Sequence, residues 1–407
     1  MRGDPMSEII IEMFPADNGD SFLIRCKGER TSNILIDFGY EETYREFIKP
    51  RLLELSADGE KLDLVVLTHI DADHVEGAQF FFEENGNSSN PSIIEVKEVW
   101  HNSFRHLAIS EGSQTIPDKL VRKVERKVKS FPTKKNQRDE TKVSIEQGTR
   151  IASLLYKYEY SWNSLFDGRA VTFSTGPIAL NEDVNLTVLS PTGSQLDRLR
   201  EHWRTGLKKL FPGVPIVDDR ILDDAVEFVS YLYPDWGVPN LSEKASSHKG
   251  LISLAENPFR EEKSVINASS ITFILDFYDK KVLFLADSQS SIIKNSLERL
   301  YENESFPIFF DAIKVSHHGS KANTSKELLD FIYSDKYLIS TNGAQYGHPH
   351  LEALARLVVN DKKYDKKNIF FNYETESSSK FSKKQWEQEF NYSVITAETN
   401  KSLIIVI

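Results

Sequence analysis

The chain has 407 residues, with 50 Lys or Arg and 61 Asp or Glu, which gives a formal net charge of −11. Its apolar fraction of 40% excludes a wholly disordered protein, and its acidity argues against one that coats nucleic acid without specificity. No apolar run approaches the roughly 20 residues that a membrane-spanning helix needs. The single cysteine, Cys26, excludes an intramolecular disulfide framework and a cysteine-rich zinc site. These features predict a cytoplasmic protein without a membrane partner.

Two kinds of pattern alternate in the first hundred residues. Apolar runs bounded by turn residues predict strands, which cover 8–14, 21–26, 33–37, 62–68 and 93–100. The fourth run is continuously apolar, as in a strand buried on both faces. Apolar residues at helical spacing predict helices at 43–55 and 75–84.

The pattern loosens over 101–183 and 193–265, and we interpret both stretches as insertions, which could bind the substrate or a protein partner. The first contains an amphipathic pattern at 119–135 with 8 basic residues and one acidic residue. This helix would either hold a nucleic-acid backbone or form a solvated surface.

Regular patterns return after each insertion. Predicted strands cover 186–190, 271–277, 282–286, 312–316, 337–340, 368–372 and 402–407, and predicted helices cover 325–333 and 351–359. The chain thus has a group of predicted strands, an insertion and a second group of predicted strands, with helices between the strands. This order predicts an α/β protein. We expect a single domain over 1–407, an αβ/βα sandwich of two mixed sheets with outer helices, whose core covers about 8–100, 184–192 and 268–407.

Four side chains that can bind metal follow the buried strand at 62–68. They are His69, Asp71, Asp73 and His74. Imidazole and carboxylate groups suit zinc, manganese or iron. In the alternative interpretation Asp73 only caps the next helix, but two histidines and two aspartates at one strand end favour a metal site.

Other polar side chains lie at or after the ends of other predicted strands, one before and the rest after this motif. They are Asp37, Asp287, the pair His317 and His318, and the pair His348 and His350. Ligands in α/β folds gather at strand ends, so we expect these groups to converge. For Asp37 alone, a simple turn role is an equal alternative.

The motif His-x-Asp-x-Asp-His after a strand, with an earlier Asp and later Asp and His, resembles the metallo-β-lactamase fold. The order of motifs is most similar to the soluble hydrolase domain of competence DNA-internalisation (ComEC-like) proteins. The shared motifs are Gly19-Asp20, 34–39, 69–74, 317–320 and 346–350. The resemblance covers about 8–100, 184–192 and 268–375, and both insertions lie outside it.

The resemblance implies two divalent ions, zinc or manganese, that share a hydroxide. His69 and Asp71 would bind one ion, Asp73 and His74 the other, and Asp287 would bridge them. The implied metal ligands are His69, Asp71, Asp73, His74, Asp287 and His317. The expected catalytic residues are Asp73, His318 and His348, and the expected supporting or substrate residues are Asp37, His101, Ser320 and His350.

The sequence departs from the superfamily pattern at two points. Asp71 stands where many members carry His, and a further His ligand after the metal motif is not obvious. His101 is the best candidate for it, ahead of His106. Both departures enrich the first site in oxygen, which favours manganese, or zinc and manganese interchangeably.

These features predict a metal-dependent hydrolase of phosphodiester bonds, specifically a nuclease with nucleic acid as its substrate. The first alternative is a hydrolase of a small ester, lactone, thioester or β-lactam, with the insertions as lids, since one fold supports many activities. The second is a catalytically degenerate interaction module. An open cationic groove would favour a polymer substrate, and a closed apolar cavity would favour a small molecule.

Overall fold

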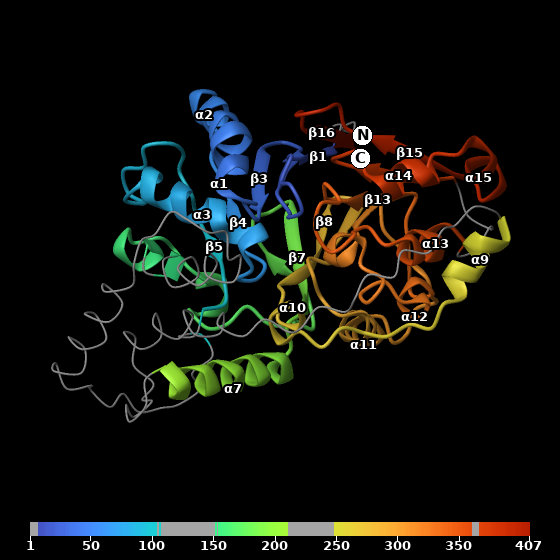
Figure 1. Cartoon of the computed structure of the whole chain (residues 1–407). Helices are drawn as coiled ribbons and strands as arrows, with labels where there is room; N and C mark the ends of the chain where they lie inside the picture. Colours follow the sequence, from blue (N-terminus) through green and yellow to red (C-terminus); the bar gives the residue numbers. More distant parts are fainter. Residues whose placement is uncertain (1–6, 104–105, 107–150, 153, 211–247, 360–365) are drawn as a thin grey trace.

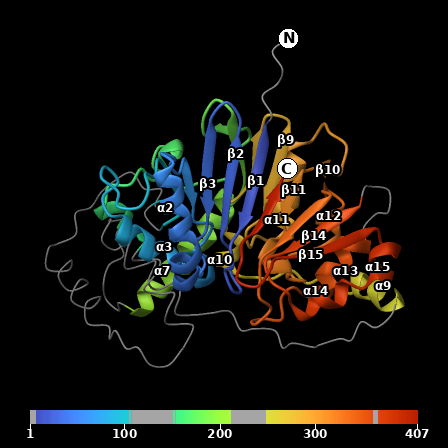
Figure 2. The same ribbon diagram turned by 90° about the horizontal axis from the view of Figure 1, so that it is seen from above.

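A computed structural model describes residues 7–103, 106, 151–152, 154–210, 248–359 and 366–407. Two β-sheets pack face to face and helices cover their outer faces (Figure 1, Figure 2). The predicted αβ/βα sandwich of two mixed sheets is confirmed. The predicted cationic helix at 119–135 lies outside the described residues.

The first sheet has six strands in the order β16-β1-β2-β3-β4-β5. Its members are β1 (Glu8–Met13), β2 (Phe22–Lys27), β3 (Thr31–Ile36), β4 (Leu64–Val66), β5 (Val99–Trp100) and β16 (Leu403–Val406). The strands from β16 to β3 are antiparallel, whereas β3, β4 and β5 are parallel. The carboxyl ends of β3 and β4 therefore meet at one edge.

The second sheet has eight strands in the order β15-β14-β13-β11-β9-β8-β7-β6. They are β6 (Ile178–Ala179), β7 (Val184–Ser190), β8 (Thr272–Phe277), β9 (Lys280–Phe284), β11 (Ala312–Lys314), β13 (Lys336–Ile339), β14 (Lys367–Phe371) and β15 (Tyr392–Thr396). The strands from β9 to β15 run parallel, so the loops that follow β9, β11 and β13 lie together. A separate parallel pair joins β10 (Ile308–Phe309) to β12 (Ile332–Tyr333).

Helices form the two outer layers, with α2 and α3 beside the first sheet and α11 to α15 beside the second (Figure 2). The helices before residue 211 are α1 (Glu41–Thr43), η1 (Tyr44–Ile48), α2 (Lys49–Ala57), α3 (Ala72–Asn85), η2 (Ser164–Phe166) and α7 (Gly193–Leu210). The later ones are α9 (His248–Glu256), α10 (Val265–Ala268), α11 (Ser290–Leu300), η3 (Ser316–Gly319), α12 (Lys326–Leu329), α13 (Leu351–Val359), α14 (Glu376–Phe381) and α15 (Lys384–Glu389). None of the helices in the described part of the chain combines the length and apolar character needed to span a bilayer.

Three buried apolar clusters hold these layers together. The middle cluster joins the facing sides of the two sheets, for example Ile11 and Ile24 with Phe273 and Leu275. The other two fill the space between each sheet and its helices. Fully burying one such side chain contributes about 1.5–3 kcal/mol, so the sheets form a rigid support for the loops at their edges.

Two predicted elements were wrong in extent. The strand expected at 93–100 is regular only at Val99–Trp100, and the helix expected at 325–333 ends at Leu329, before β12. Part of the stretch interpreted as the first insertion belongs to the sandwich, because β6 pairs with β7 and Ile151 and Leu155 are buried beneath α3.

Candidate metal centre

The carboxyl ends of parallel strands bring the polar motifs together. Ile36 pairs with Val66, which sets Asp37 beside Thr68, and His69 follows. In the second sheet Phe284 pairs with Lys314, and the N–H of His317 donates to the carbonyl oxygen of Ala286 over 2.9 Å. Loops from both sheets therefore face one another at a single edge of the sandwich.

One oxygen of Asp287 lies at the centre of this edge. Its Oδ2 is 3.9 Å from Nε2 of His69, 3.6 Å from those of His74 and His317, and 3.5 Å from that of His318. These separations exceed the usual range of hydrogen bonds. Two ligands that are each about 2.1 Å from a tetrahedral ion lie about 3.4 Å apart, so the spacing fits atoms that share a metal.

Buried nitrogen atoms give a second indication of a cation. The Nε2 atoms of His69, His74 and His318 are buried without a hydrogen-bond partner in the described part of the chain. Leaving such a group unsatisfied costs about 1–3 kcal/mol. Bound divalent cations would remove this cost by accepting the lone pairs of these nitrogen atoms.

The other ring nitrogens fix the direction of these lone pairs. Nδ1 of His74 donates to Oδ2 of Asp37 over 2.7 Å, and Nδ1 of His318 donates to the carbonyl oxygen of Ser340 over 2.9 Å. Thr68 Oγ1 donates to Asp37, which leaves its lone pair to accept from Nδ1 of His69 at 3.0 Å. With the proton on Nδ1, each Nε2 is free to bind metal.

The acidic groups and imidazoles are electrostatically coupled. Burial by itself lowers the pKa of His318, but Asp287 and Asp20 outweigh it and raise that pKa to about 10. Burial likewise opposes the shift of His74, whose pKa Asp287 and Asp37 raise well above its ordinary value. Burial raises the pKa of Asp73 despite the neighbouring histidines. Proteins often concentrate such perturbed groups at functional sites.

The remaining members of the metal motif lie at the start of α3. Asp71 precedes the helix, and its Oδ2 is 3.4 Å from Nε2 of His69. Asp73 is in the first turn, where Oδ2 accepts from Nδ2 of Asn18 over 3.1 Å and lies 3.6 Å from Nε2 of His318. We call the following cluster the metal cup: His69, Asp71, Asp73, His74, Asp287, His317 and His318.

The two adjacent late histidines differ in their surroundings. His318 is buried and belongs to two of the four groups of acidic and imidazole side chains that gather within 4.8 Å in the described residues. His317 is in none of these groups. Its Nδ1 is 3.1 Å from Oδ1 of Asn323 and 3.3 Å from Oε2 of Glu262.

The other expected residues lie at different distances from the metal cup. The ring of His348 is 5.0 Å from that of His317 and 4.8 Å from that of His350, so both extra imidazoles line its rim. Ser320 holds its own loop, since its N–H donates to the carbonyl oxygen of His317. His101 stacks on the Trp162 indole at 5.9 Å and belongs to none of the four metal-competent groups.

Sequence reasoning missed Lys314. Its buried ammonium group contacts the carboxylate of Asp20, donates to the carbonyl oxygen of Ala286 and lies 3.7 Å from Oδ1 of Asp287. Asp20 is held in place because its N–H donates to the carbonyl oxygen of Asp73 over 3.2 Å. The sequence signal that could have identified it is a lysine inside an otherwise apolar predicted strand.

Gly19 explains why this turn can approach α3 so closely. A Cβ atom at that position would lie 1.8 Å from the carbonyl oxygen of Asp73. A side chain there would push the turn away from the helix and separate Asp20 from the metal cup.

Comparison with known proteins agrees with this architecture. Residues 15–144 match the family model described as the metallo-beta-lactamase superfamily. The fold is a metallo-β-lactamase sandwich. This fold implies divalent metal binding, and the clustered His and Asp side chains fit that requirement.

A search of curated proteins gave no match. Among solved structures, the chain is similar to the crystal structure of a long form RNase Z from yeast, with a TM-score of 0.33 and 10% sequence identity. The alignment covers 90% of this chain and 36% of that chain, so the protein spans about a third of the yeast enzyme's length. The superfamily match and the metal cup together support a metal-dependent hydrolase.

Proposed function

We propose that the protein is a metal-dependent phosphodiesterase, and specifically a nuclease. The observation that carries this proposal is the convergence of four Nε2 atoms on one oxygen of Asp287, with Asp71 and Asp73 beside them. Such a cup of imidazole and carboxylate groups fits a pair of divalent cations that share one carboxylate.

The geometry favours a division of ligands around Asp287. Asp73, His74 and His318 form one group within 4.8 Å and would hold one ion. His69 and Asp71, which lie 3.4 Å apart, would hold the other ion. We assign His317 to this second set, because its Nε2 also faces Asp287. Each set then has two imidazoles and one carboxylate beside Asp287, a mixture of nitrogen and oxygen ligands that suits zinc or manganese.

When bound, two divalent cations lower the pKa of a water molecule towards 7 and neutralise charge that develops on a phosphoryl group. The protein's own groups then bind and orient the substrate. His348 and His350 lie beyond the ligands, at the rim of the metal cup. Burial lowers the pKa of His348 well below its ordinary value and that of His350 to about 4, so both rings are neutral. A neutral imidazole can donate one N–H to a non-bridging oxygen of a phosphodiester, so these rings suit the binding and orientation of that group.

The nearest supporting groups keep the ligands in place. Asp37 fixes His74, and Glu262 and Asn323 face Nδ1 of His317. Residues of this kind hold a metal ligand in one tautomer and one orientation, and their loss usually weakens metal affinity about 10–100-fold.

The test compares substrates and matched aspartate variants. With Mn²⁺ or Zn²⁺ present, the wild type is expected to hydrolyse bis(p-nitrophenyl) phosphate and single- or double-stranded nucleic acid, but not the β-lactam nitrocefin or p-nitrophenyl acetate. Asp287→Asn is expected to lower kcat by at least about a thousandfold. Asp276→Asn, which changes a half-buried aspartate on β8 paired with Lys281, serves as the control.

Two outcomes would contradict the proposal. In the first, the metal-loaded wild type leaves every phosphodiester intact while it cleaves nitrocefin or the acetate ester. In the second, Asp287→Asn retains the wild-type rate on phosphodiesters. Equal losses in Asp287→Asn and Asp276→Asn would show a general folding defect, and circular dichroism on both variants identifies that case.

A further inference from the structure

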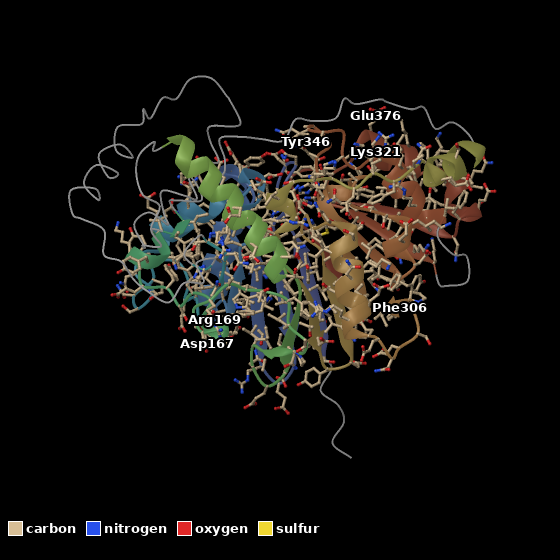
Figure 3. The ribbon with its side chains drawn as sticks, turned by 90° about the horizontal axis from the view of Figure 1, so that it is seen from below. Asp167, Arg169, Phe306, Lys321, Tyr346 and Glu376 are labelled. Atoms are coloured by element: carbon tan, nitrogen blue, oxygen red, sulfur yellow. The ribbon has the colours of Figure 1, made fainter. Side chains whose placement is uncertain are left out.

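Tyr346 is a highly exposed aromatic side chain beside the metal cup. It is 65% exposed, more than any other large apolar or aromatic side chain among the described residues. Figure 3 shows Tyr346 and Lys321 at the same edge of the molecule. Lys321 is linked to the rim by its N–H, which donates to Nδ1 of His350 over 3.2 Å.

The backbone at Tyr346 is held in a turn that disfavours a bulky residue. The N–H of His348 donates to the carbonyl oxygen of Gln345 over 3.3 Å, and the two central residues, Tyr346 and Gly347, have φ values of 52° and 68°. Turns with two positive φ values select Gly, Asn or Asp. A tyrosine at such a position is strained, and strained residues cluster at ligand sites.

Ring contacts connect Tyr346 to the metal cup. Its ring lies 5.9 Å from that of His348, which in turn lies 5.0 Å from His317 and 6.0 Å from His318. Tyr346 therefore contacts His348, and His348 in turn contacts the imidazoles that surround Asp287. A nucleotide whose phosphate occupies the metal cup carries its base one sugar away, within reach of this ring.

The loop that carries Tyr346 is anchored at both ends. Asn342 donates to Asp17 through its backbone N–H at 2.7 Å and its side-chain Nδ2 at 3.0 Å. At the other end the N–H of His350 donates to the carbonyl oxygen of Gly319 over 3.0 Å. A ring presented by a fixed loop loses little conformational entropy when a flat ligand stacks on it.

We propose that Tyr346 is a stacking subsite for one unpaired nucleobase adjacent to the phosphate in the metal cup. This inference rests on the proposed nuclease function and specifies its substrate. Stacking on an aromatic ring tolerates any base, because every base has a π-face. A base paired within a duplex cannot reach the ring, so the substrate is single-stranded nucleic acid or an unpaired end.

The test measures binding of two probes of equal length and charge. One is a phosphorothioate oligothymidylate, and the other has the same backbone with abasic residues, both labelled for fluorescence anisotropy and presented to the metal-loaded protein. Tyr346→Ala is expected to weaken oligothymidylate binding about ten- to a hundredfold and to affect the abasic probe at least tenfold less. Tyr346→Phe and Tyr346→Trp retain a ring and are expected to preserve the preference for the base-bearing probe.

The matched control is Tyr278→Ala. Tyr278 is 47% exposed and also has a positive φ, but it lies in the two-residue turn between β8 and β9, where its hydroxyl contacts Asp183. This variant is expected to bind both probes as the wild type does. A matching loss in Tyr278→Ala would show that removing any exposed tyrosine has the same effect, and would overturn the subsite.

Three results separate this inference from the proposed function. A wild type that binds both probes equally overturns the stacking subsite, while hydrolysis of bis(p-nitrophenyl) phosphate by the same preparation upholds the phosphodiesterase. A wild type that binds neither probe overturns the subsite together with the choice of nucleic acid. If Tyr346→Ala still prefers the base-bearing probe, the base binds elsewhere and the stacking subsite is overturned.

Discussion

Replacing Asp37 by Asn tests the metal cup through a residue that does not itself face Asp287. Asp37 is fully buried and accepts three hydrogen bonds, from the backbone N–H of Thr68 at 2.8 Å, from its hydroxyl at 2.7 Å and from Nδ1 of His74 at 2.7 Å. Its φ is 54°, a conformation that Asn adopts as readily as Asp. The substitution therefore preserves the shape of the loop.

The chemical consequence is a change of tautomer. An amide in place of the carboxylate can present its NH₂ group to Nδ1 of His74 while its oxygen accepts from Thr68. Nδ1 then accepts, and the proton moves to Nε2, the atom that faces Asp287 at 3.6 Å. We expect metal affinity to fall about 10–100-fold, which corresponds to about 1.4–2.8 kcal/mol.

Asp37→Ala adds a loss of stability to this effect. It leaves the Thr68 N–H, the Thr68 hydroxyl and Nδ1 of His74 without their acceptor, and we expect a cost of about 3–5 kcal/mol in the free energy of unfolding. Asp37→Asn should cost much less, because the amide oxygen still accepts one of these bonds. Urea unfolding of the metal-free variants separates this term from metal affinity.

Isothermal titration with Mn²⁺ or Zn²⁺ gives the affinities, with Asp63→Asn as the control. Asp63 is also buried and accepts a backbone N–H, from Asn33 at 3.0 Å, but its other partner is Lys97 and not an imidazole. The control is expected to lose stability and keep its metal affinity. Wild-type affinity in Asp37→Asn, or the same loss in Asp63→Asn, would refute the argument.

Three further predictions address neighbouring groups and the metal itself. Glu262→Gln replaces an acceptor 3.3 Å from Nδ1 of His317 and should weaken metal binding severalfold in a titration, and an unchanged affinity would show that Asn323 suffices. Lys314→Met leaves the buried Asp20 carboxylate without its cation, so urea unfolding should show a loss of about 3–5 kcal/mol, and an unchanged midpoint would argue against the pair. Metal at 100 times its Kd should add about 2.7 kcal/mol and raise Tm by about 3 °C in the wild type but not in Asp287→Asn, and equal shifts in both would place the metal elsewhere.

The fold was predictable from sequence because its strands have strong local signals. The buried strand that becomes β4, and the position of His69 just after the predicted strand, could be predicted from the local sequence pattern alone. The strand expected at 93–100 was wrong over most of its length. Ile93 and Ile94 are buried in the cluster that includes α3 without pairing to β4, and Val96 makes only an isolated bridge to Leu62. Apolar character alone does not distinguish a paired strand from an irregular buried segment.

The supporting residues of the site were less predictable, since their roles depend on contacts between distant parts of the chain. Glu262 is 55 residues before His317 in sequence and lies in the stretch interpreted as an insertion, yet it lies against Nδ1 of that ring. Lys314 is a strand residue that meets Asp20 only when the two sheets have closed on each other. No spacing rule connects such pairs before folding.

The resemblance implied only His317 as a late metal ligand, and the adjacent pair His317 and His318 shows what it missed. In an extended strand, neighbouring side chains point to opposite faces, so only one of two consecutive histidines would face a metal. Here both residues have positive φ, 46° and 51°, and both Nε2 atoms lie within 3.6 Å of the same oxygen of Asp287. We infer that this backbone reversal lets His317 supply the imidazole sought in His101, so that one loop serves both sides of Asp287.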